Sequence, residues 1–486
     1  MSRLPASKQI PRPLESPQLT LVEQLFQWGQ RRIQERVFRP GMRMPSIRQM
    51  AVEQGVSRFT VVEAYERLVA HGYLESRRGA GFFVREQQNA PQPQPARTTV
   101  PTTIDVAWLM RNILQTTEPE RGPGLGYLPN RWLDGDMLSL GLRAIARQSG
   151  AQLLSYAHPQ GFLPLRQQLQ TRLAEIEIGA PPEQIVLLSG ITQAVDLIAR
   201  CYLQSGDAVI VGDPAWFQMF GTLTRHDVNL LGMPYTPAGP DLDALEVLVE
   251  TWRPRLMIIN SVLHNPTGTS LSAAQAFRIL QLAERYDFLV VEDDIYGDLC
   301  PASQAFTRIA SLDQLRRVIY LGSFSKTLAA NLRVAYAACA PGIAKMLADQ
   351  KILLTLTTPE TNERLVYKVL TEGHYRRHVE RLRQRLDTVR EPTARLLQRL
   401  GLKLFCEPPA GMFLWADAGV DTAALTVRAH EENFLLAPGS LFSPHQSPST
   451  WMRFNIANCG DPALEAFLAK NLGKNPDNAG ARRAGP

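Results

Sequence analysis

Six short apolar runs in the middle of the chain restrict its fold more than any other feature of the sequence. Each run has the length of a strand, and stretches with helical spacing of apolar residues separate the runs. Continuous apolar runs are typical of parallel strands that are buried on both faces between helices. The alternation predicts an α/β domain with a parallel sheet, whose strands are expected at residues 185–189, 208–212, 256–261, 288–293, 318–321 and 333–338.

The pattern changes from about residue 345 onward. A long charged helix is expected at 375–400, and a mixed stretch follows it, which predicts a smaller C-terminal α+β subdomain. Residues 475–486 carry Gly, Ala and Arg without periodicity and are expected to form a disordered tail. The α/β domain and its subdomain are therefore expected to span residues 104–474.

Polar side chains and glycines gather just after the expected strands. Asp293 ends one apolar run, while Gly190, Asn265 and Lys326 follow three others. In open α/β sheets, ligands bind beyond the carboxyl ends of the strands. We therefore expect these residues to lie at a single site.

An amine, an acid three residues before a phenol, and an amide are groups that together suit pyridoxal phosphate (PLP). Lys326 would bind the aldehyde of the cofactor covalently. Asp293 would pair with the pyridine nitrogen and keep it protonated. Tyr296 and Asn265 would hydrogen-bond the phenolate oxygen, and Trp216 would stack on the ring face. The sequence predicts PLP as the cofactor.

The cofactor phosphate and the carboxylate of a bound amino compound each need a cation. Arg333 is the candidate cation for the phosphate, and Arg453 is the candidate for a bidentate grip on a substrate or effector carboxylate. Two hydroxyls and the N–H groups at the start of a helix would complete the phosphate site, from Ser323, Ser325, Gly190, Ile191 and Thr192.

Two of these assignments compete with other interpretations. Asp294 could be the functional acid, but the three-residue step to Tyr296 favours Asp293 and leaves Asp294 as a supporting acid. Ser323 and Lys326 also match the spacing of serine–lysine hydrolases, although no accompanying hydrolase motif occurs.

Two further residues have structural alternatives. Trp216 could belong to ordinary core packing, and Arg453 could be the partner of a structural ion pair. The five cysteines are scattered and include no CxxC pair, so the sequence predicts neither a disulfide framework nor a metal site.

The positive charge of the chain is concentrated in its first fifth. Residues 1–97 contain 15 basic and 8 acidic residues, whereas the remainder contains 37 basic and 38 acidic residues. Such asymmetry is typical of a phosphate-binding module attached to a neutral body, although a solvated basic face is the simpler alternative. A Pro- and Gln-rich stretch at 87–103 separates the two parts and is expected to be an extended linker.

Helix signals within the basic segment decide between these alternatives. A helix is expected at 19–36, and Ser46 and Ser57 are candidate caps of two further helices, 47–54 and 58–69, on either side of Gly55. Residues 72–85 predict a β-hairpin wing. The segment 16–86 is thus expected to be a winged helix-turn-helix that binds double-stranded DNA. The candidate contacts are Arg48, Ser57, Arg58, Thr60, Arg77 and Arg78.

These motifs resemble those of the MocR family, in which a GntR-type winged helix-turn-helix is fused to a fold-type I aminotransferase-like domain. Residues 40–48 and 55–65 look like the GntR signature. Residues 156–166, 264–268, 292–296 and 323–326 look like aminotransferase-like blocks. Phe59, Thr192 and Ala335 depart from the residues that are usual at these positions.

The resemblance implies a PLP-dependent transcription regulator whose aminotransferase-like domain senses an amino compound or PLP itself. The alternative is an active aminotransferase that carries an accessory DNA-binding domain. The family likeness also implies a homodimer in which Tyr156 reaches the cofactor phosphate of the partner subunit. No apolar run approaches the length of a membrane span, and no signal peptide is recognisable, so a cytoplasmic protein is expected.

Overall fold

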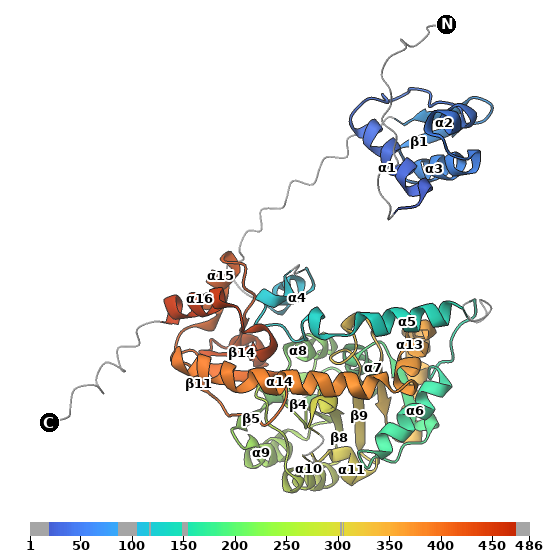
Figure 1. The fold of residues 1–486 in the computed structure, drawn as a ribbon. Helices are drawn as coiled ribbons and strands as arrows, with labels where there is room; N and C mark the ends of the chain where they lie inside the picture. The colour runs from blue at the N-terminus through green and yellow to red at the C-terminus, as the bar shows by residue number, and fades with distance from the viewer. Residues whose placement is uncertain are drawn as a thin grey trace, which may run out of the picture. The chain divides into compact units, whose positions relative to one another are not determined.

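The computed structural model describes residues 19–85, 105–115, 118–147, 154–301, 304 and 306–472. The chain divides into two compact units, residues 1–99 and 100–486, which are described separately below (Figure 1). The expected linker at 87–103 and the expected tail at 475–486 lie outside the described residues, so the domain boundaries stay predictions.

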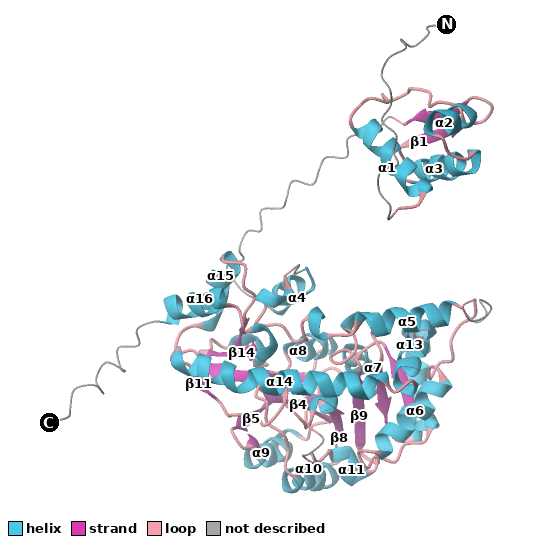
Figure 2. Cartoon of the chain, viewed as in Figure 1, coloured by secondary structure: helices cyan, strands magenta, loops and turns pink. Residues whose placement is uncertain are grey.

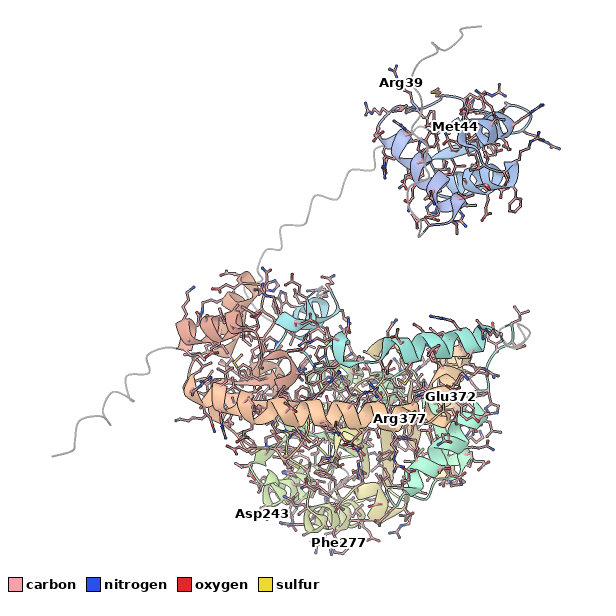
Figure 3. The ribbon with its side chains drawn as sticks, in the orientation of Figure 1. Arg39, Met44, Asp243, Phe277, Glu372 and Arg377 are labelled. Atoms are coloured by element: carbon pink, nitrogen blue, oxygen red, sulfur yellow. The ribbon has the colours of Figure 1, made fainter. Side chains whose placement is uncertain are left out.

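The N-terminal unit is a helix-turn-helix followed by a two-stranded wing, as the sequence predicts. The side chains of Ser46 and Ser57 cap the second and third helices, and Gly55 between them has a φ of 67°, a conformation that favours glycine. Met44 lies in the core of this unit and Arg39 on its surface (Figure 3). The elements are α1 (Leu21–Gln34), α2 (Ile47–Gln54), α3 (Arg58–Ala70), β1 (Leu74–Arg77) and β2 (Gly81–Val84).

An eight-stranded sheet forms the centre of the C-terminal unit, in the order β3-β10-β9-β8-β7-β4-β5-β6 (Figure 2). Alternate side chains of β3 join two different core clusters, Ile185 in one and Val186 in the other, so both faces of this strand are covered. The strands are β3 (Ile185–Leu188), β4 (Ala208–Asp213), β5 (Asn229–Thr236), β6 (Gly239–Pro240), β7 (Leu256–Ile259), β8 (Leu289–Asp293), β9 (Val318–Ser323) and β10 (Ala335–Ala338).

Helices before, between and after these strands pack around the sheet (Figure 2). They are α4 (Val106–Gln115), α5 (Gly135–Ala146), α6 (Leu163–Ala174), α7 (Ile191–Tyr202), α8 (Phe217–Leu223), α9 (Leu242–Trp252), α10 (Ala273–Tyr286), α11 (Ile309–Asp313), α12 (Pro341–Thr355) and α13 (Glu360–Thr371). None of the helices in the described ranges combines the length and the apolar character that a membrane-spanning segment needs.

The α/β class is confirmed, but the prediction of a parallel sheet is wrong at two strands, β10 and the short edge strand β6, which pairs antiparallel with β5. β10 pairs antiparallel with both β3 and β9, while β4, β7, β8 and β9 run parallel to their neighbours in this group. Only 11 residues join β9 to β10, and they contain no α-helix. A parallel return needs a crossover of a dozen or more residues, so this short connection leads into an antiparallel strand.

The smaller subdomain begins later than the sequence indicates, at α14 (His374–Arg399) rather than near residue 345. Helices α12 and α13 pack against the large sheet. Leu347 lies in one of the two hydrophobic clusters that cover the sheet, and Leu365 lies in the other. After α14 a four-stranded antiparallel sheet follows, in the order β11-β12-β14-β13. Its elements are β11 (Lys403–Leu404), β12 (Phe413–Asp417), α15 (Thr422–Glu431), β13 (Ala437–Pro438), β14 (Trp451–Asn455) and α16 (Pro462–Leu472).

Candidate functional site

A cavity lies in the C-terminal unit at the carboxyl ends of β4, β7 and β8 and beside the loop that follows β9. The parallel strands bring these loops to one edge of the sheet, where ligands bind in open α/β folds. Six of the residues predicted from the sequence line this cavity: Asn265, Asp293, Tyr296, Lys326, Trp216 and Arg453.

Lys326 provides the amine of the cavity. Its Nζ donates a hydrogen bond to the carbonyl of Gly126 at 2.7 Å. Burial and the nearby Arg453 together lower the pKa of Lys326 to about 8, although Asp293 acts in the opposite direction. A lysine with such a pKa has a much larger unprotonated fraction near neutral pH than an ordinary lysine, and its unprotonated amine is a nucleophile for an aldehyde.

The serine–lysine alternative has no support in the hydrogen bonds of this loop. The hydroxyl of Ser323 lies 3.1 Å from that of Ser325, and it also accepts the backbone N–H of Ser325 at 3.2 Å. The amine of Lys326 is bonded to Gly126 instead of to either serine. A serine that is activated by lysine needs a direct hydrogen bond to that amine.

The two adjacent aspartates face different surroundings. Asp293 lines the cavity, and its carboxylate accepts the backbone N–H of Ile295 at 3.2 Å. Asp294 lies outside the cavity lining, where it accepts hydrogen bonds from Arg308 at 2.9 Å and from the Tyr320 hydroxyl at 2.7 Å. Asp293 is therefore the acid available to a ligand, and Asp294 forms a buried ion pair behind it.

The pKa of Asp293 predicts how the stability of the cofactor-free protein depends on pH. Burial raises this pKa from 3.8 to about 7, so the folded protein holds a proton that the unfolded chain has released. Its contribution to the free energy of unfolding is complete below the unfolded pKa and is lost as the pH rises toward 7. Asp293→Asn removes this titration. Urea unfolding should show the variant gaining stability relative to wild type as the pH rises from 4 to 7, and parallel curves would contradict the assignment.

Tyr296 and Asn265 form a hydrogen-bonded pair at the cavity wall. The Nδ2 of Asn265 donates to the Tyr296 hydroxyl at 3.3 Å, and both side chains are buried. Burial raises the pKa of Tyr296 well above its usual value, so the phenol stays protonated and can donate its O–H. The pair can therefore offer both an N–H and an O–H to an oxygen atom of a ligand.

Arg453 is a buried guanidinium with spare hydrogen-bonding capacity. It is 1% exposed and donates to Asn265 Oδ1 at 2.8 Å and to the Gly124 carbonyl at 2.6 Å, while its Nε has no hydrogen-bond partner in the part of the chain that the structure describes. The guanidinium carbon lies 4.5 Å and 5.0 Å from the ring centres of Phe413 and Phe442. Burial lowers the pKa of Arg453 to about 10, which still leaves it charged at neutral pH.

The structural ion-pair interpretation of Arg453 lacks a partner. Within the described ranges, no aspartate or glutamate lies at ion-pair distance from this guanidinium. A buried cation without an anion is costly, and an anionic ligand would compensate it. The unpartnered Nε makes the cavity suited to a carboxylate.

Arg333 and Gly190 meet beside the cavity at the N-terminus of α7. The Nη2 of Arg333 donates to the Ser189 carbonyl at 2.9 Å. Gly190 has a φ of 100°, and a Cβ at this position would lie 2.1 Å from the same nitrogen. Only glycine therefore allows the guanidinium to approach the helix start, where Ile191 and Thr192 supply the first N–H groups. A cation beside free N–H groups is an arrangement that binds phosphate.

Tyr156 and Trp216 occupy contrasting positions. Trp216 is partly buried and lines the cavity at the start of α8, although it also packs against the core cluster. Tyr156 is 83% exposed and does not line the cavity. Its predicted role toward a partner subunit stays a prediction.

Sequence reasoning missed residues that support the predicted ones. Asn260 donates a hydrogen bond to the carbonyl of Asp293 and accepts the backbone N–H of Asn265 at 2.8 Å, so one amide links two cavity residues. Its place at the end of a predicted strand was a usable signal. Phe413 and Phe442 come from distant parts of the chain and carry no local signal.

The candidate DNA contacts of the N-terminal unit differ in accessibility. Arg48 and Arg58 are exposed at the starts of α2 and α3. Ser57 accepts the backbone N–H of Thr60 at 3.0 Å, and their hydroxyls lie 2.8 Å apart. Thr60 is only 8% exposed, so in this structure it stabilises the start of α3 and is not free to meet a ligand.

The two arginines of the wing also differ. Arg77 forms an ion pair with Glu75, and its guanidinium carbon lies 4.5 Å from the ring centre of Phe83. Arg78 is exposed in the turn between β1 and β2, and no partner is found for it in the described part of the chain. Arg78 is therefore the more available of the two for a phosphate.

The fold and the cavity define an aminotransferase-like protein of fold type I with an added helix-turn-helix unit. Residues 133–470 match the family model of aminotransferase class I and II, and residues 21–84 match the model of bacterial regulatory proteins of the gntR family. The first match covers more than half of the chain, so the protein belongs to the aminotransferase class I and II family. The predicted combination of a GntR-type domain with an aminotransferase-like domain is confirmed.

Proteins of two kinds are similar to this chain. A 2-aminoadipate transaminase of Thermus thermophilus is 33% identical over 326 residues, which cover 64% of this chain and 79% of the relative. The HTH-type transcriptional regulator YdcR of Escherichia coli is 26% identical and aligns over 93% of this chain and 98% of its own length. The HTH-type transcriptional regulator NorG of Staphylococcus aureus is 23% identical, with 82% and 92% covered.

Solved structures agree with the fold. The kynurenine aminotransferase of Pyrococcus horikoshii superimposes with a TM-score of 0.69 at 25% identity, covering 76% of this chain and 93% of its own. The α-aminoadipate aminotransferase LysN of Thermus thermophilus superimposes with a TM-score of 0.68 at 28% identity, covering 75% and 94%. These two proteins were solved with PMP and with a phosphopyridoxyl-leucine, respectively. Together with the family match, this confirms the prediction of PLP as the cofactor.

Proposed function

We propose that the protein is a PLP-dependent transcription regulator that binds operator DNA and senses a small amino compound. One observation carries this proposal: a single chain combines a helix-turn-helix unit with a cavity that collects an amine, an acid, a phenol and a guanidinium. Relatives that align over both units are named as HTH-type transcriptional regulators, which supports the same conclusion. Because such a protein must reach chromosomal DNA, we also propose a cytoplasmic location.

The residues of the cavity fit PLP in their chemistry. When bound, PLP supplies an aldehyde that joins amines and a ring that withdraws electrons. Lys326 would hold the aldehyde, and Asp293 would hold the ring nitrogen in its protonated form. Tyr296 and Asn265 would donate hydrogen bonds to the ring oxygen, and Trp216 would cover the ring face.

The phosphate would lie at the N-terminus of α7. There Arg333 supplies the positive charge, and the left-handed Gly190 leaves room for it beside the helix start. The hydroxyls of Ser323 and Ser325 precede Lys326 directly and would add hydrogen bonds. The positive end of the helix favours the negative charge of the phosphate.

The effector would be an amino compound with a carboxylate. Arg453 would bind this carboxylate through Nε, which has no hydrogen-bond partner among the described residues, and through an adjoining Nη. The amine of the effector would lie beside Lys326, whose Nζ would accept its proton. These two groups lie in the same cavity, so one small molecule could engage both. PLP itself remains the alternative signal.

We further propose that the protein acts as a homodimer. Leu353, Leu354 and Leu356 at the end of α12 are 80%, 43% and 51% exposed, and Tyr156 is 83% exposed. Clustered exposed leucines at one helix end are typical of an interface between subunits. The hydroxyl of Thr355 accepts a hydrogen bond from Gln193 on α7, so this region adjoins the proposed phosphate site.

The regulator proposal is tested by measuring whether effector binding and DNA binding change each other's affinity. An effector can shift DNA binding only by its differential affinity for two states, and operator DNA must then change effector affinity by the same factor. We expect a change of about 5- to 150-fold, which is typical of allosteric coupling. Titrating the PLP-loaded full chain with amino acids, followed by absorbance, with and without a selected DNA duplex, measures this factor.

The control for this titration is Arg453→Lys, which keeps the charge but loses the bidentate geometry. It should weaken the binding of amino acids while leaving that of amines without a carboxylate unchanged. Equal effector affinities with and without DNA, for every compound that binds, would contradict the regulator proposal.

An active aminotransferase is the second candidate, and one observation favours it. The cavity contains the amine, the acid and a buried arginine together, which is more than a DNA-binding protein needs. Several similar proteins are named as aminotransferases. Sustained transamination by the full chain, with no effect of the same amino acids on DNA binding, would support this function.

A further inference from the structure

Phe59 is the one phenylalanine in the described part of the N-terminal unit whose ring has no packing partner there. Among the described residues 19–85, the other phenylalanines each have a partner within the unit. The ring of Phe26 contacts that of His71, Phe38 contacts Trp28 and Phe82 contacts Tyr65, and Arg77 lies over Phe83. Phe59 is 75% exposed, forms no ring pair and is absent from the core cluster.

The position of Phe59 explains why it is left outside. It is the second residue of α3, whose inner face buries Thr60, Val61 and Ala64. The cap of this helix occupies the hydroxyls of Ser57 and Thr60. Arg58 and Phe59 are therefore the exposed side chains at the helix start.

The helix starts beside Phe59 carry basic and no acidic side chains, and Glu63, one turn further along α3, is paired with Arg67. The first turns of α2 and α3 contain no aspartate or glutamate, and Arg48 and Arg58 are exposed there. Such a surface complements a duplex, whose phosphates attract the arginines. The major groove offers one apolar group, the 5-methyl of thymine, and a phenylalanine ring can contact it.

We infer that Phe59 determines base specificity by packing on the 5-methyl group of a thymine in the major groove. This inference rests on the proposed DNA-binding function, and it adds an apolar contact with the DNA to the charged contacts. Arg58, one residue earlier, would contact a neighbouring base edge or phosphate. Alternatively, a protein partner could cover the ring, and one outcome of the experiment below would indicate this.

Deoxyuracil isolates the methyl group, because it differs from thymine by this group alone. Duplexes are first selected from a random-sequence library with the full chain. Each thymine of a selected duplex is then replaced by deoxyuracil. We expect one position at which the dissociation constant of the wild type rises roughly fourfold, the loss expected for one buried methyl group.

Phe59→Ala should bind the thymine and the deoxyuracil duplexes with equal affinity, whereas Phe59→Leu should keep part of the difference. Val37→Ala is the matched control, since Val37 is an exposed apolar residue of the same unit outside α2, α3 and the wing. It should discriminate like the wild type. Because Phe59 is exposed, its variants should fold, which circular dichroism checks.

Two results would overturn the inference. The wild type could be insensitive to every replacement, or Phe59→Ala could discriminate as the wild type does, which would indicate that the ring serves a protein partner. Failure to select any duplex would instead overturn the proposed DNA-binding function itself. The two failures are thus distinguishable.

Discussion

Lys326→Ala should abolish the covalent attachment of PLP while leaving the protein folded. The wild type, reduced with borohydride, should carry the cofactor on Lys326, and the variant should carry none there. We expect the fold to survive because burial and the positive charge of Arg453 already disfavour the ammonium form of this lysine. Peptide mass spectrometry and the visible absorbance of the bound cofactor measure the result.

Lys345 offers a matched control for this experiment. It is an exposed lysine on α12 that forms an ion pair with Asp349 at 2.7 Å. Lys345→Ala should therefore retain the cofactor attachment and its absorbance. Covalent attachment that persists in Lys326→Ala would show that another amine holds the cofactor.

Asp294→Asn should destabilise the fold by about 3–5 kcal/mol, which is the usual cost of removing one partner of a buried ion pair. Arg308 would keep its charge in a site where its side chain is only 10% exposed. Urea or thermal unfolding of the cofactor-free protein measures the loss. The neighbouring change, Asp293→Asn, removes no ion pair and should instead weaken the binding of PLP.

The double variant Asp294→Asn/Arg308→Met separates the two effects. It removes the stranded charge, so a large part of the lost stability should return. Both single aspartate variants should also be titrated with PLP by absorbance. A larger loss of PLP affinity in Asp294→Asn than in Asp293→Asn, at equal folding, would mean that the functional acid is misassigned by one residue.

Much of the candidate site was predictable because it lies at strand ends. Asp293, Asn265 and Lys326 follow apolar runs that are recognisable by themselves, and a parallel sheet gathers such ends at one edge. The three-residue step to Tyr296 favours Asp293 over Asp294, and the structure places Asp293 at the end of β8 and Asp294 just after the strand.

Other features depend on contacts between distant segments. From the sequence, Arg453 could bind a carboxylate or form a structural ion pair. The structure places Phe413, Phe442 and Gly124 around it. An apolar run in the sequence does not show whether a strand runs parallel or antiparallel to its neighbours. The direction of β10 therefore became clear only from its pairing with β3 and β9. Helical spacing alone does not show whether Phe59 is exposed or buried.

The sequence by itself determined the class of fold, the helix-turn-helix with its wing, and the choice of cofactor. These depend on local signals, namely apolar periodicity, capping residues and the side chains that follow strands. Only the tertiary structure decided which groups are free to act. Among the described residues it left Arg453 Nε without a hydrogen-bond partner and Phe59 without a ring partner, and it engaged Asp294, Thr60 and Arg77. The physical reason is that burial, ion pairing and hydrogen bonding depend on neighbours that lie far apart along the chain.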